Sequence, residues 1–499
     1  MKMRLVKLLT LLLFTVPIYA KDRPNVILFL VDDMGLMDTS VPFIIDASGK
    51  PKTYPLNSFY KTPNMEKLAN QGVRFTNFYA HSVCSPTRTT LMTGQNSARH
   101  GVTNYIKPES NNRGAYGPKD WNWTGIKKNT LTLPKLLKDN GYQTIHVGKA
   151  HFAPIGYEGE DPCNIGFNVN IGGSAIGQPG SYYGKDGYGN IAGNKKRAVQ
   201  GLEAYYKDDI FLTEALTIEA NKQISKAVDK EKPFFLYMAH YAVHAPFHTD
   251  PRFIDHYNNS DKSKRAKAYA TLIEGIDKSL GDIIHHVNEL GIGENTLIIF
   301  MGDNGSDAPL PIKKNYSSSS PIKGKKGNNW EGGMRVPFIA SWVKPSSQKT
   351  LQQDTPVKKD AIQKQMGTAM DILPTICSIT NTKIPKEMTI DGFSLELQFD
   401  GKRNRHRNEI FLNHFPHKHR SSYFTSMVKY PWKVIYHYPV EKAASYELYN
   451  LKEDPFETSN LASENTKQLH KMMKSLDREL IKEHALYPKK DGQLLKPII

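Results

Sequence analysis

The feature that most constrains the fold is a set of short, continuously apolar segments that alternate with helix-like segments. The clearest apolar segments are residues 25–31, 233–239 and 296–301, and weaker strand candidates are residues 73–79 and 142–147. Apolar residues without alternation are typical of strands buried on both faces, as in a parallel sheet. Segments with helical patterning separate them, at residues 62–72, 131–140, 211–229 and 262–290. This alternation predicts an α/β fold with a large, mostly parallel sheet that is flanked by helices.

The pattern changes after about residue 405. Four strand-like segments separated by turns follow, EIFLNHF, SSYFTSMV, WKVIYHY and YELYNL, and residues 464–484 have the pattern of a polar helix. We therefore expect a large α/β domain over residues 21–404 and a small domain of antiparallel strands plus a helix over residues 405–499. Residues 156–195 are rich in Gly, Asn and Tyr and predict a long surface loop, a feature that is usually functional.

Composition excludes several other classes of protein. The 499 residues are 39% hydrophobic, which is enough for a large core and excludes a wholly disordered chain. Three cysteines are too few for a disulfide-stapled scaffold, and whether Cys163 and Cys377 pair is left open. The net charge of +17 favours polyanionic partners such as nucleic acid, anionic membrane or sulfated polysaccharide.

The N-terminus has the pattern of a secretory signal peptide. Basic residues come first, an apolar stretch covers residues 8–19, and Ala20 supplies a small residue at the expected cleavage site. An uncut anchor helix is the alternative, but roughly a dozen apolar residues are short for a membrane span. We therefore expect removal of residues 1–20 and a periplasmic or secreted protein. Neither stable membrane insertion nor a nucleic-acid partner is expected.

Polar side chains follow two of the apolar segments directly. Asp32 and Asp33 come after residues 25–31, and Asp303 and Asn304 come just after residues 296–301. Ligands of open α/β sheets bind outside the carboxyl ends of the strands, and these hard oxygen donors suit Ca²⁺, or Mg²⁺, better than Zn²⁺. The alternative for each pair is helix capping or turn formation, which Asp and Asn perform often. Two pairs at corresponding strand ends favour a metal site, with Ca²⁺ as the expected ion.

Residues 81–94, HSVCSPTRTTLMTG, contain the motif Cys-x-Pro-x-Arg from Cys84 to Arg88, followed by an apolar pair and Thr-Gly. This segment resembles the signature of the type I sulfatases, a family of the alkaline phosphatase superfamily. In that family the motif Cys is oxidised to formylglycine. The resemblance therefore implies formylglycine (3-oxoalanine) at position 84 and a maturation partner, either a formylglycine-generating enzyme or an anaerobic sulfatase-maturating enzyme. A buried structural thiol is the alternative for Cys84.

The resemblance extends over essentially the whole mature chain. Further matching segments are residues 141–152, 241–246, 302–305, 324–337 and 448–461. Thr87, Phe247 and Gly302 depart from the commonest family residues, Ser, His and Ser. The chain as a whole resembles exported bacterial polysaccharide sulfatases, which implies an alkaline-phosphatase-like fold and a catalytic sulfatase domain over residues 21–404.

The resemblance also implies roles for individual residues. Formylglycine at position 84 and four side chains would hold the divalent cation, namely Asp32, Asp33, Asp303 and Asn304. One hydroxyl of the hydrated aldehyde would attack sulfur, and the second would let the covalent sulfate ester collapse without water attacking sulfur. Arg88 would orient these hydroxyls, and Lys149, Lys326 and His244 would surround the sulfate. His151 would accept a proton from the geminal diol, while His244 or Lys326 would protonate the leaving oxygen.

Substrate recognition is predicted from two basic segments. The segment HFPHKHR contains His414, His417 and Arg420, and Arg99 and His100 follow the signature segment. These five residues are candidates to contact a sulfated polysaccharide or oligosaccharide, either algal, such as ulvan or carrageenan, or a host glycosaminoglycan. A solvated surface turn is the alternative for the first segment.

Two other functions remain open at this stage. A divalent cation and a nucleophile in the same arrangement would also suit a phosphomonoester or phosphonate hydrolase. A non-catalytic polyanion-binding relative would keep the fold without the chemistry. Relative rates of hydrolysis of an aryl sulfate and an aryl phosphate distinguish a sulfatase from the first alternative. The modification state of Cys84 distinguishes it from the second.

Overall fold

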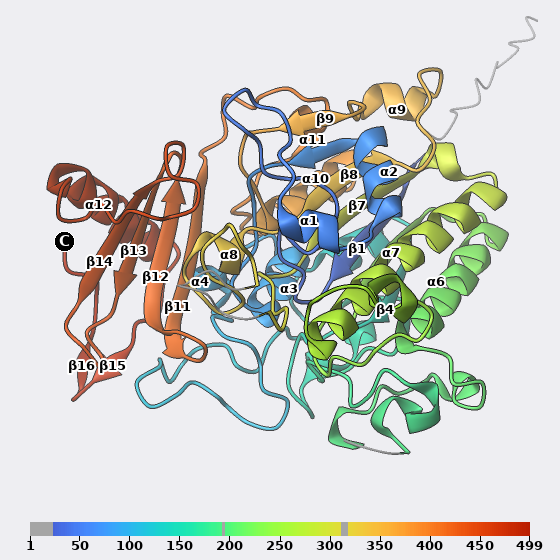
Figure 1. Cartoon of the computed structure of the whole chain (residues 1–499), viewed down its shortest axis with the longest axis horizontal. Helices are drawn as coiled ribbons and strands as arrows, with labels where there is room; N and C mark the ends of the chain where they lie inside the picture. Colours follow the sequence, from blue (N-terminus) through green and yellow to red (C-terminus); the bar gives the residue numbers. More distant parts are fainter. Residues whose placement is uncertain (1–22, 192–194, 311–317) are drawn as a thin grey trace, which may run out of the picture.

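The structure is a computed structural model that describes residues 23–191, 195–310 and 318–499. The predicted signal peptide, residues 1–20, lies outside the described residues. Figure 1 shows a large sheet with helices on both faces and, beside it, a small sheet with its own helix. Across the part of the chain that the structure describes, no helix is both long and apolar enough to cross a membrane.

The large sheet has eight strands in the order β5-β4-β6-β1-β7-β8-β2-β9. Their bounds are β1 Asn25–Val31, β2 Val73–Phe75, β4 Gln143–Gly148, β5 Val169–Ile171, β6 Phe234–His240, β7 Thr296–Gly302, β8 Phe338–Trp342 and β9 Ala361–Gln363. All neighbouring pairs are parallel except the two that involve β8. The central strands β6, β1 and β7 are buried throughout, as their continuous apolar sequences predict. The predicted mostly parallel α/β sheet is therefore confirmed.

Alternate residues of β1 enter two separate cores. Ile27 and Phe29 pack with α2 (Pro63–Gln71), α6 (Leu212–Asp229) and α7 (Lys264–Glu289) on one face of the sheet. Val26 and Leu28 pack with α3 (Cys84–Thr93), α5 (Leu133–Asp139) and α10 (Ile372–Ile379) on the other. Helices on both faces explain why a central strand needs apolar residues at every position.

Some elements differ from the sequence-based expectation. Residues 73–79 form two short strands, β2 and β3 (Phe78–Tyr79), because β3 leaves the large sheet and pairs with β10 (Gly367–Thr368). The predicted loop 156–195 contains β5 and short 3₁₀ turns. Strand β8 was not predicted, because five residues that include the polar Ser341 are too few for a distinct apolar pattern. Cys163 is exposed and Cys377 is buried, and both are free thiols.

The small sheet is antiparallel, in the order β11-β12-β13-β14. Its strands are β11 Ile410–Lys418, β12 Ser422–Lys429, β13 Trp432–His437 and β14 Ser445–Asn450. Helix α12 (Thr466–Lys482) packs on it through Met472, Met473, Leu476 and Leu480. The predicted antiparallel strands and closing helix are confirmed, while the domain boundary at residue 405 stays a prediction. The remaining elements are α1 Pro55–Phe59, α4 Ser97–His100, α8 Glu331–Met334, α9 Thr350–Asp354, α11 Glu396–Phe399, β15 Lys489–Lys490 and β16 Gln493–Leu494.

A buried ion triad ties the small sheet to the rest of the chain. Lys433 Nζ on β13 lies 3.0 Å from Glu331 Oε1 and 2.7 Å from Glu457 Oε1. Glu457 also accepts a hydrogen bond from the backbone N–H of Glu331 over 2.7 Å. All three side chains are buried, so each charge depends on the others for compensation.

We expect Lys433→Met to destabilise the protein strongly, because it leaves two buried carboxylates without their cation. The expected loss in the free energy of unfolding is about 3–5 kcal/mol, measured by urea denaturation. Lys452→Met is the matched control, since Lys452 is exposed and pairs only with exposed Glu453. Equal stability of the two variants would show that the triad contributes nothing to the fold.

Candidate active site

The carboxyl ends of β1 and β7 carry four polar side chains, Asp32, Asp33, Asp303 and Asn304. The two strands are parallel neighbours and pair over their whole length, so the residues after each strand lie side by side. One oxygen from each of Asp32, Asp33 and Asp303 lies within 4.8 Å of the others. The backbone N–H of Asp33 donates to Asp303 Oδ1 over 3.0 Å, and Asn304 Nδ2 donates to Asp33 Oδ1 over 2.9 Å. The structure thus brings together the two strand-end pairs.

Three buried cations offset the three carboxylates of this cluster. The shortest contacts are Lys149 Nζ to Asp32 Oδ2 at 2.7 Å, Lys326 Nζ to Asp33 Oδ1 at 2.6 Å and Arg88 Nη2 to Asp303 Oδ2 at 2.8 Å. Two buried oxygens, Asp32 Oδ1 and Asn304 Oδ1, accept no hydrogen bond from the described residues. Buried acceptors are normally satisfied, and hard oxygens are the ligands that Ca²⁺ and Mg²⁺ prefer. The residues present therefore fit a divalent cation.

The carboxyl groups of the cluster are perturbed in opposite directions. Burial alone would raise the pKa of Asp33, but the nearby Lys326 and His244 outweigh it and hold this pKa well below its usual range. Burial, reinforced by the charge of Asp32, raises the pKa of Asp303 to about 6. Groups with such divergent pKa values are typical of functional sites, and a bound cation would favour the ionised form of each.

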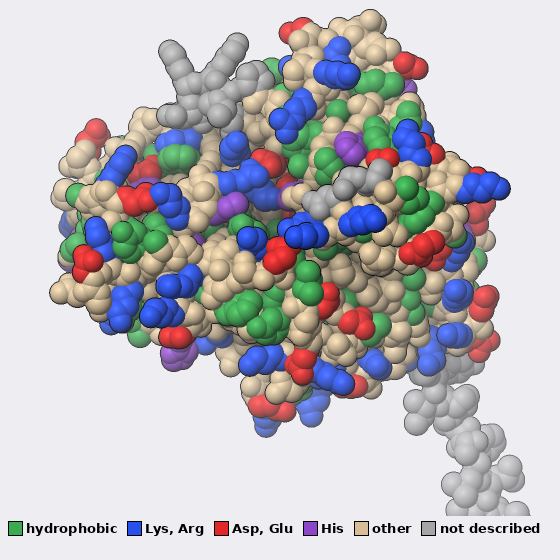
Figure 2. All heavy atoms as spheres, turned by 90° about the horizontal axis from the view of Figure 1, so that it is seen from below, with side chains coloured by type: hydrophobic (Ala, Val, Ile, Leu, Met, Phe, Trp, Pro, Cys, Tyr) green, Lys and Arg blue, Asp and Glu red, His purple; other side chains and the backbone are tan. Residues whose placement is uncertain are grey.

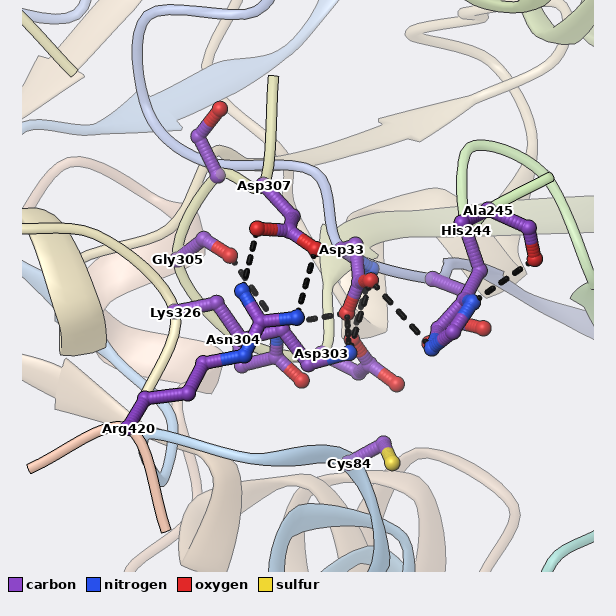
Figure 3. A network of polar contacts seen from close by, with 12 residues as sticks. Asp33, Cys84, His244, Ala245, Asp303, Asn304, Gly305, Asp307, Lys326 and Arg420 are labelled. Atoms are coloured by element: carbon purple, nitrogen blue, oxygen red, sulfur yellow. Dashed lines mark hydrogen bonds and ion pairs between the residues drawn. The ribbon is translucent and has the colours of Figure 1, made fainter. Parts of the chain in front are cut away.

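Helix α3 begins at Cys84 and directs its first turn toward the carboxylate cluster (Figure 3). Cys84 is buried, and its Sγ lies 3.4 Å from His151 Nδ1. His151 Nε2 lies 2.6 Å from the carbonyl oxygen of Ile106, so Nε2 carries the proton and Nδ1 is left as an acceptor. One turn later, Arg88 donates to Asp303 Oδ2 through Nε and Nη2. Residue 84 therefore lies between a proton acceptor and the candidate cation site.

Two histidines of the site are neutral at physiological pH. Burial and the charge of Lys149 lower the pKa of His151 well below its ordinary value. Burial and Lys326 lower the pKa of His244 to about 3, although Asp33 opposes this. His244 follows β6, and its Nε2 lies 3.6 Å from Asp33 Oδ2. The segments after β1, β6 and β7 and helix α3 thus contribute to one site at one edge of the sheet.

A pocket of about 260 Å³ opens over residue 84. Cys84, His151, His244 and Lys326 form its inner part. Its rim includes Tyr105, Lys107, Gln178, Arg197, His419 and Arg420. Seen from below the view of Figure 1, the surface is hollowed, and basic, acidic and histidine side chains meet there (Figure 2). The pocket size suits a small group at the end of a larger substrate.

The structure brings only one of the five candidate substrate-binding residues to this pocket, Arg420. Arg99 is held by Asp391 and Glu483, with contacts of 2.9 and 2.8 Å. The other three are histidines with hydrogen-bond partners inside the fold, half-buried His100 with Thr90, buried His414 with Thr425 and Leu486, and buried His417 with Thr103 and Arg113. Edge strand β11 contacts α4, and its His417 is covered by the loop that follows α4, whereas its His414 is covered by the C-terminal segment at Leu486.

Sequence reasoning missed five residues of the pocket rim, Tyr105, Lys107, Gln178, Arg197 and His419. Gln178 lies in the predicted long loop 156–195, and the length of this loop was the one sequence feature that could have marked it as functional. His419 lies inside the basic segment around Arg420, while Tyr105, Lys107 and Arg197 carry no local pattern that marks them. Their placement depends on how distant loops pack together.

Arg420 comes from the small sheet and meets the large domain at the pocket. Its guanidinium forms a two-pronged ion pair with Asp307, with Nη2 2.8 Å from Oδ2. We expect Arg420→Ala to raise KM for a sulfated oligosaccharide by roughly tenfold, because a hydrogen bond from a charged donor is lost. The value of kcat/KM on 4-nitrophenyl sulfate should stay within about twofold, because this small ester does not reach the rim.

Arg405→Ala is the control for this measurement, since Arg405 is an exposed arginine outside the pocket lining. Equal losses on the aryl ester and the oligosaccharide would indicate that Arg420 acts through the fold and not through the substrate.

Comparisons with known proteins agree with this arrangement. The model of the sulfatase family matches residues 24–382, and the model described as N-sulphoglucosamine sulphohydrolase, C-terminal, matches residues 326–485. The chain therefore belongs to the sulfatase family, a class of sulfuric ester hydrolases of the formylglycine type in the alkaline phosphatase superfamily. The resemblance seen in the sequence is confirmed at this level.

The relatives extend the match along most of the chain. A mouse N-acetylgalactosamine-6-sulfatase is 31% identical over 75% of this chain, which spans 66% of the length of that enzyme. A sulfatase of Formosa agariphila is 27% identical and covers 95% of this chain and 94% of its own. The crystal structure of Ps i-CgsB superimposes with a TM-score of 0.72 at 24% identity, over 95% of each chain. The structural likeness confirms the fold, including the small sheet.

Proposed function

We propose that this protein hydrolyses sulfate esters of a sulfated carbohydrate, with a formylglycine formed from Cys84 as the nucleophile. The observation that carries the proposal is the position of Cys84 at the start of α3. Its Sγ lies 3.4 Å from an acceptor nitrogen of His151, beside three carboxylates and three buried cations. A proton acceptor, a candidate cation site and buried positive charges thus surround the side chain of Cys84, which the proposal takes to be the modified residue.

Neutralisation of charge is the first requirement, because a sulfate ester is an anion whose oxygens shield sulfur from attack. Lys326 places a compact ammonium group in the lining of the pocket, and Lys149 adds a second one that is buried beside Asp32, where burial strengthens the interaction with an anion. Formylglycine supplies, when hydrated, two geminal hydroxyls, one to attack sulfur and one to release sulfate afterwards. Arg88 is anchored to Asp303 and to the carbonyl oxygen of Lys149 over 2.7 Å, so it holds the first turn of α3 in place.

Proton transfers are assigned to side chains that the structure places around residue 84. His151 presents Nδ1 as an acceptor beside residue 84, and it accepts the proton of the attacking hydroxyl. The two candidate donors to the leaving oxygen, His244 and Lys326, both line the pocket. We assign this proton to Lys326, because burial and the charge of Lys326 lower the pKa of His244 to about 3 and leave it neutral. Burial opposes a charge on Lys326, but Asp33 outweighs it and raises the pKa of Lys326 above its ordinary value. Lys326 therefore keeps its proton at neutral pH.

A divalent cation, Ca²⁺ in our proposal, would be held by Asp32, Asp33, Asp303 and Asn304 together with residue 84. The cation supplies a Lewis acid that polarises a sulfate oxygen and stabilises negative charge as the S–O bond breaks. The support for this assignment is the carboxylate cluster with its two unpaired buried oxygens. The choice of Ca²⁺ over Mg²⁺ follows from the number of oxygen donors that are available.

The substrate class is inferred from the relatives and from the charge of the chain. Two relatives carry names that point to sulfated sugars, the N-acetylgalactosamine-6-sulfatase and Ps i-CgsB, which was also solved with k-i-k-neocarrahexaose. The net charge of +17 suits a sulfated polysaccharide or oligosaccharide. We further propose export after cleavage of residues 1–20, with Cys84 oxidised by a dedicated maturation enzyme.

The experiment that tests the proposed function measures release of inorganic sulfate from a panel of defined sulfated sugars. 4-Nitrophenyl sulfate and 4-nitrophenyl phosphate serve as small reference substrates. We expect sulfate release from at least one sugar and a kcat/KM on the aryl sulfate well above that on the aryl phosphate. Faster phosphate release would favour the phosphoester hydrolase, and no turnover with fully modified Cys84 would favour a non-catalytic polyanion-binding protein.

A further inference from the structure

Helix α12 carries a row of basic side chains on the face that points away from the small sheet. The row consists of five exposed residues, Lys467, Lys471, Lys474, Arg478 and Lys482. At 3.6 residues per turn they fall within about 80° of the helix circumference, and they extend over about 22 Å. The face that packs on the small sheet lies on the opposite side of the helix. The row is therefore a straight, solvent-facing line of positive charge.

Most of this charge is not compensated within the fold. Over the described residues, Lys482 forms ion pairs with Glu479 and Glu483, but the other four members of the row form none. Like charges three and four residues apart repel one another and weaken a helix. An external polyanion would relieve this repulsion.

The row ends at a groove of about 440 Å³ between α12 and the start of β11. Lys429 Nζ and Arg478 Nη2 meet there at Ser475 Oγ, over 3.0 and 3.4 Å. Arg407 also lines the groove, and its side chain is only 2% exposed. Its Nη2 pairs with Asp371 at 2.5 Å, while no residue that the structure describes accepts a hydrogen bond from Nε or Nη1. Because these two Arg407 atoms are themselves buried, the donors that the groove offers to an oxyanion are the exposed Lys429 and Arg478.

We propose that the basic row of α12 and this groove bind a linear anionic polysaccharide at a distance from the catalytic pocket. The proposal rests on the proposed function only in taking that polymer to be the sulfated substrate. The acidic side chains that line the groove do not oppose it, because Glu409 pairs with Arg403 and Glu479 with Lys482. An anionic bilayer is the less favoured partner, since the exposed arc of α12 offers one large apolar side chain, Ile481.

Strand β11 connects the groove to the catalytic pocket. Ile410 at its start lines the groove, and His419 and Arg420, just beyond its end, line the pocket. Nine residues of strand span about 30 Å, so the two sites lie well apart at opposite ends of β11. A polymer held on α12 stays near the pocket, which raises the local concentration of its sulfated ends.

The test uses the triple variant Lys467→Gln, Lys471→Gln, Lys474→Gln, because Gln keeps helix propensity while removing charge. The control replaces three exposed lysines at the end of α6 in the same way, Lys226, Lys230 and Lys232. Binding of a heparin dodecasaccharide is measured by calorimetry at two salt concentrations, in full-length protein that also carries Cys84→Ala so that the probe stays intact. Anionic phosphatidylglycerol vesicles form the second arm.

We expect the triple variant to bind heparin about tenfold more weakly and with a shallower dependence on salt concentration. The reason is that three exposed ion pairs between lysine and sulfate are lost. The control variant should bind as the parent does. The same triple substitution in protein that keeps Cys84 should leave kcat/KM on 4-nitrophenyl sulfate unchanged. It should lower kcat/KM on a sulfated polymer.

Equal heparin affinity of the triple and control variants would overturn the proposal, as would a loss that appears only with vesicles. A different result would contradict the proposed function, namely that the parent protein does not hydrolyse aryl sulfate. Heparin binding does not depend on that reaction.

Discussion

Replacing Cys84 by Ala should abolish sulfate ester hydrolysis, with a fall in kcat of at least about 10³-fold, because the side chain that becomes the nucleophile is gone. The fold should tolerate the change, since Cys84 is the first residue of α3 and its Sγ has only the long 3.4 Å contact with His151. The measurement is 4-nitrophenyl sulfate turnover at saturating substrate, with the melting temperature recorded alongside.

Cys163→Ala is the matched control, because Cys163 is an exposed free thiol outside the pocket lining. It should leave kcat unchanged. If Cys84→Ala kept more than a tenth of the parent activity at a normal melting temperature, nucleophilic catalysis by residue 84 would be excluded.

The second large effect is expected from the cation site. Addition of Ca²⁺ to chelator-treated protein should restore activity and raise the free energy of unfolding, by about 2.7 kcal/mol at a hundredfold excess over Kd. Asp303→Asn should remove both responses, because it takes one carboxylate from the cluster and deprives the buried Arg88 of its nearest charged partner. Thermal unfolding with and without Ca²⁺ separates the lost response from the lower baseline stability.

Asp277→Asn provides the comparison for this experiment. Asp277 is also buried, and it accepts hydrogen bonds from the backbone of Asn64 and Met65 at the start of α2. This variant should unfold at a lower temperature and still respond to Ca²⁺. An unchanged Ca²⁺ response in Asp303→Asn would place the ion elsewhere.

The parts of the site that depend on strand ends and on one contiguous motif could be predicted from the sequence. Asp33 and Asp303 were found because a parallel sheet brings the ends of its strands to one edge, and β1 and β7 do pair in register. Cys84 and Arg88 were found because both lie in one contiguous motif, Cys-x-Pro-x-Arg, that resembles the sulfatase signature, and the structure places both in the first turns of α3. Lys326 was chosen over Lys325 by its place before Gly327, and the structure puts Lys326 on Asp33.

The parts that depend on tertiary packing could not be predicted. The segment around His414 looks like a basic surface turn, but it forms edge strand β11, whose His417 packs on the large domain and whose His414 packs on the C-terminal segment. His414 and His417 are therefore buried, and only His419 and Arg420 reach the pocket. Arg197 lines the same pocket, although it lies more than two hundred residues before Arg420 in the sequence. No local sequence pattern predicts that these two residues come together.

The account rests on the chemical state of one side chain, and mass spectrometry of the tryptic peptide from Phe75 to Arg88 measures it most directly. Protein from the native host, with thiols alkylated before digestion, should give a peptide about 18 Da lighter than the unalkylated cysteine form, because formylglycine has replaced Cys84. A fully alkylated peptide from protein that still releases sulfate would contradict the account.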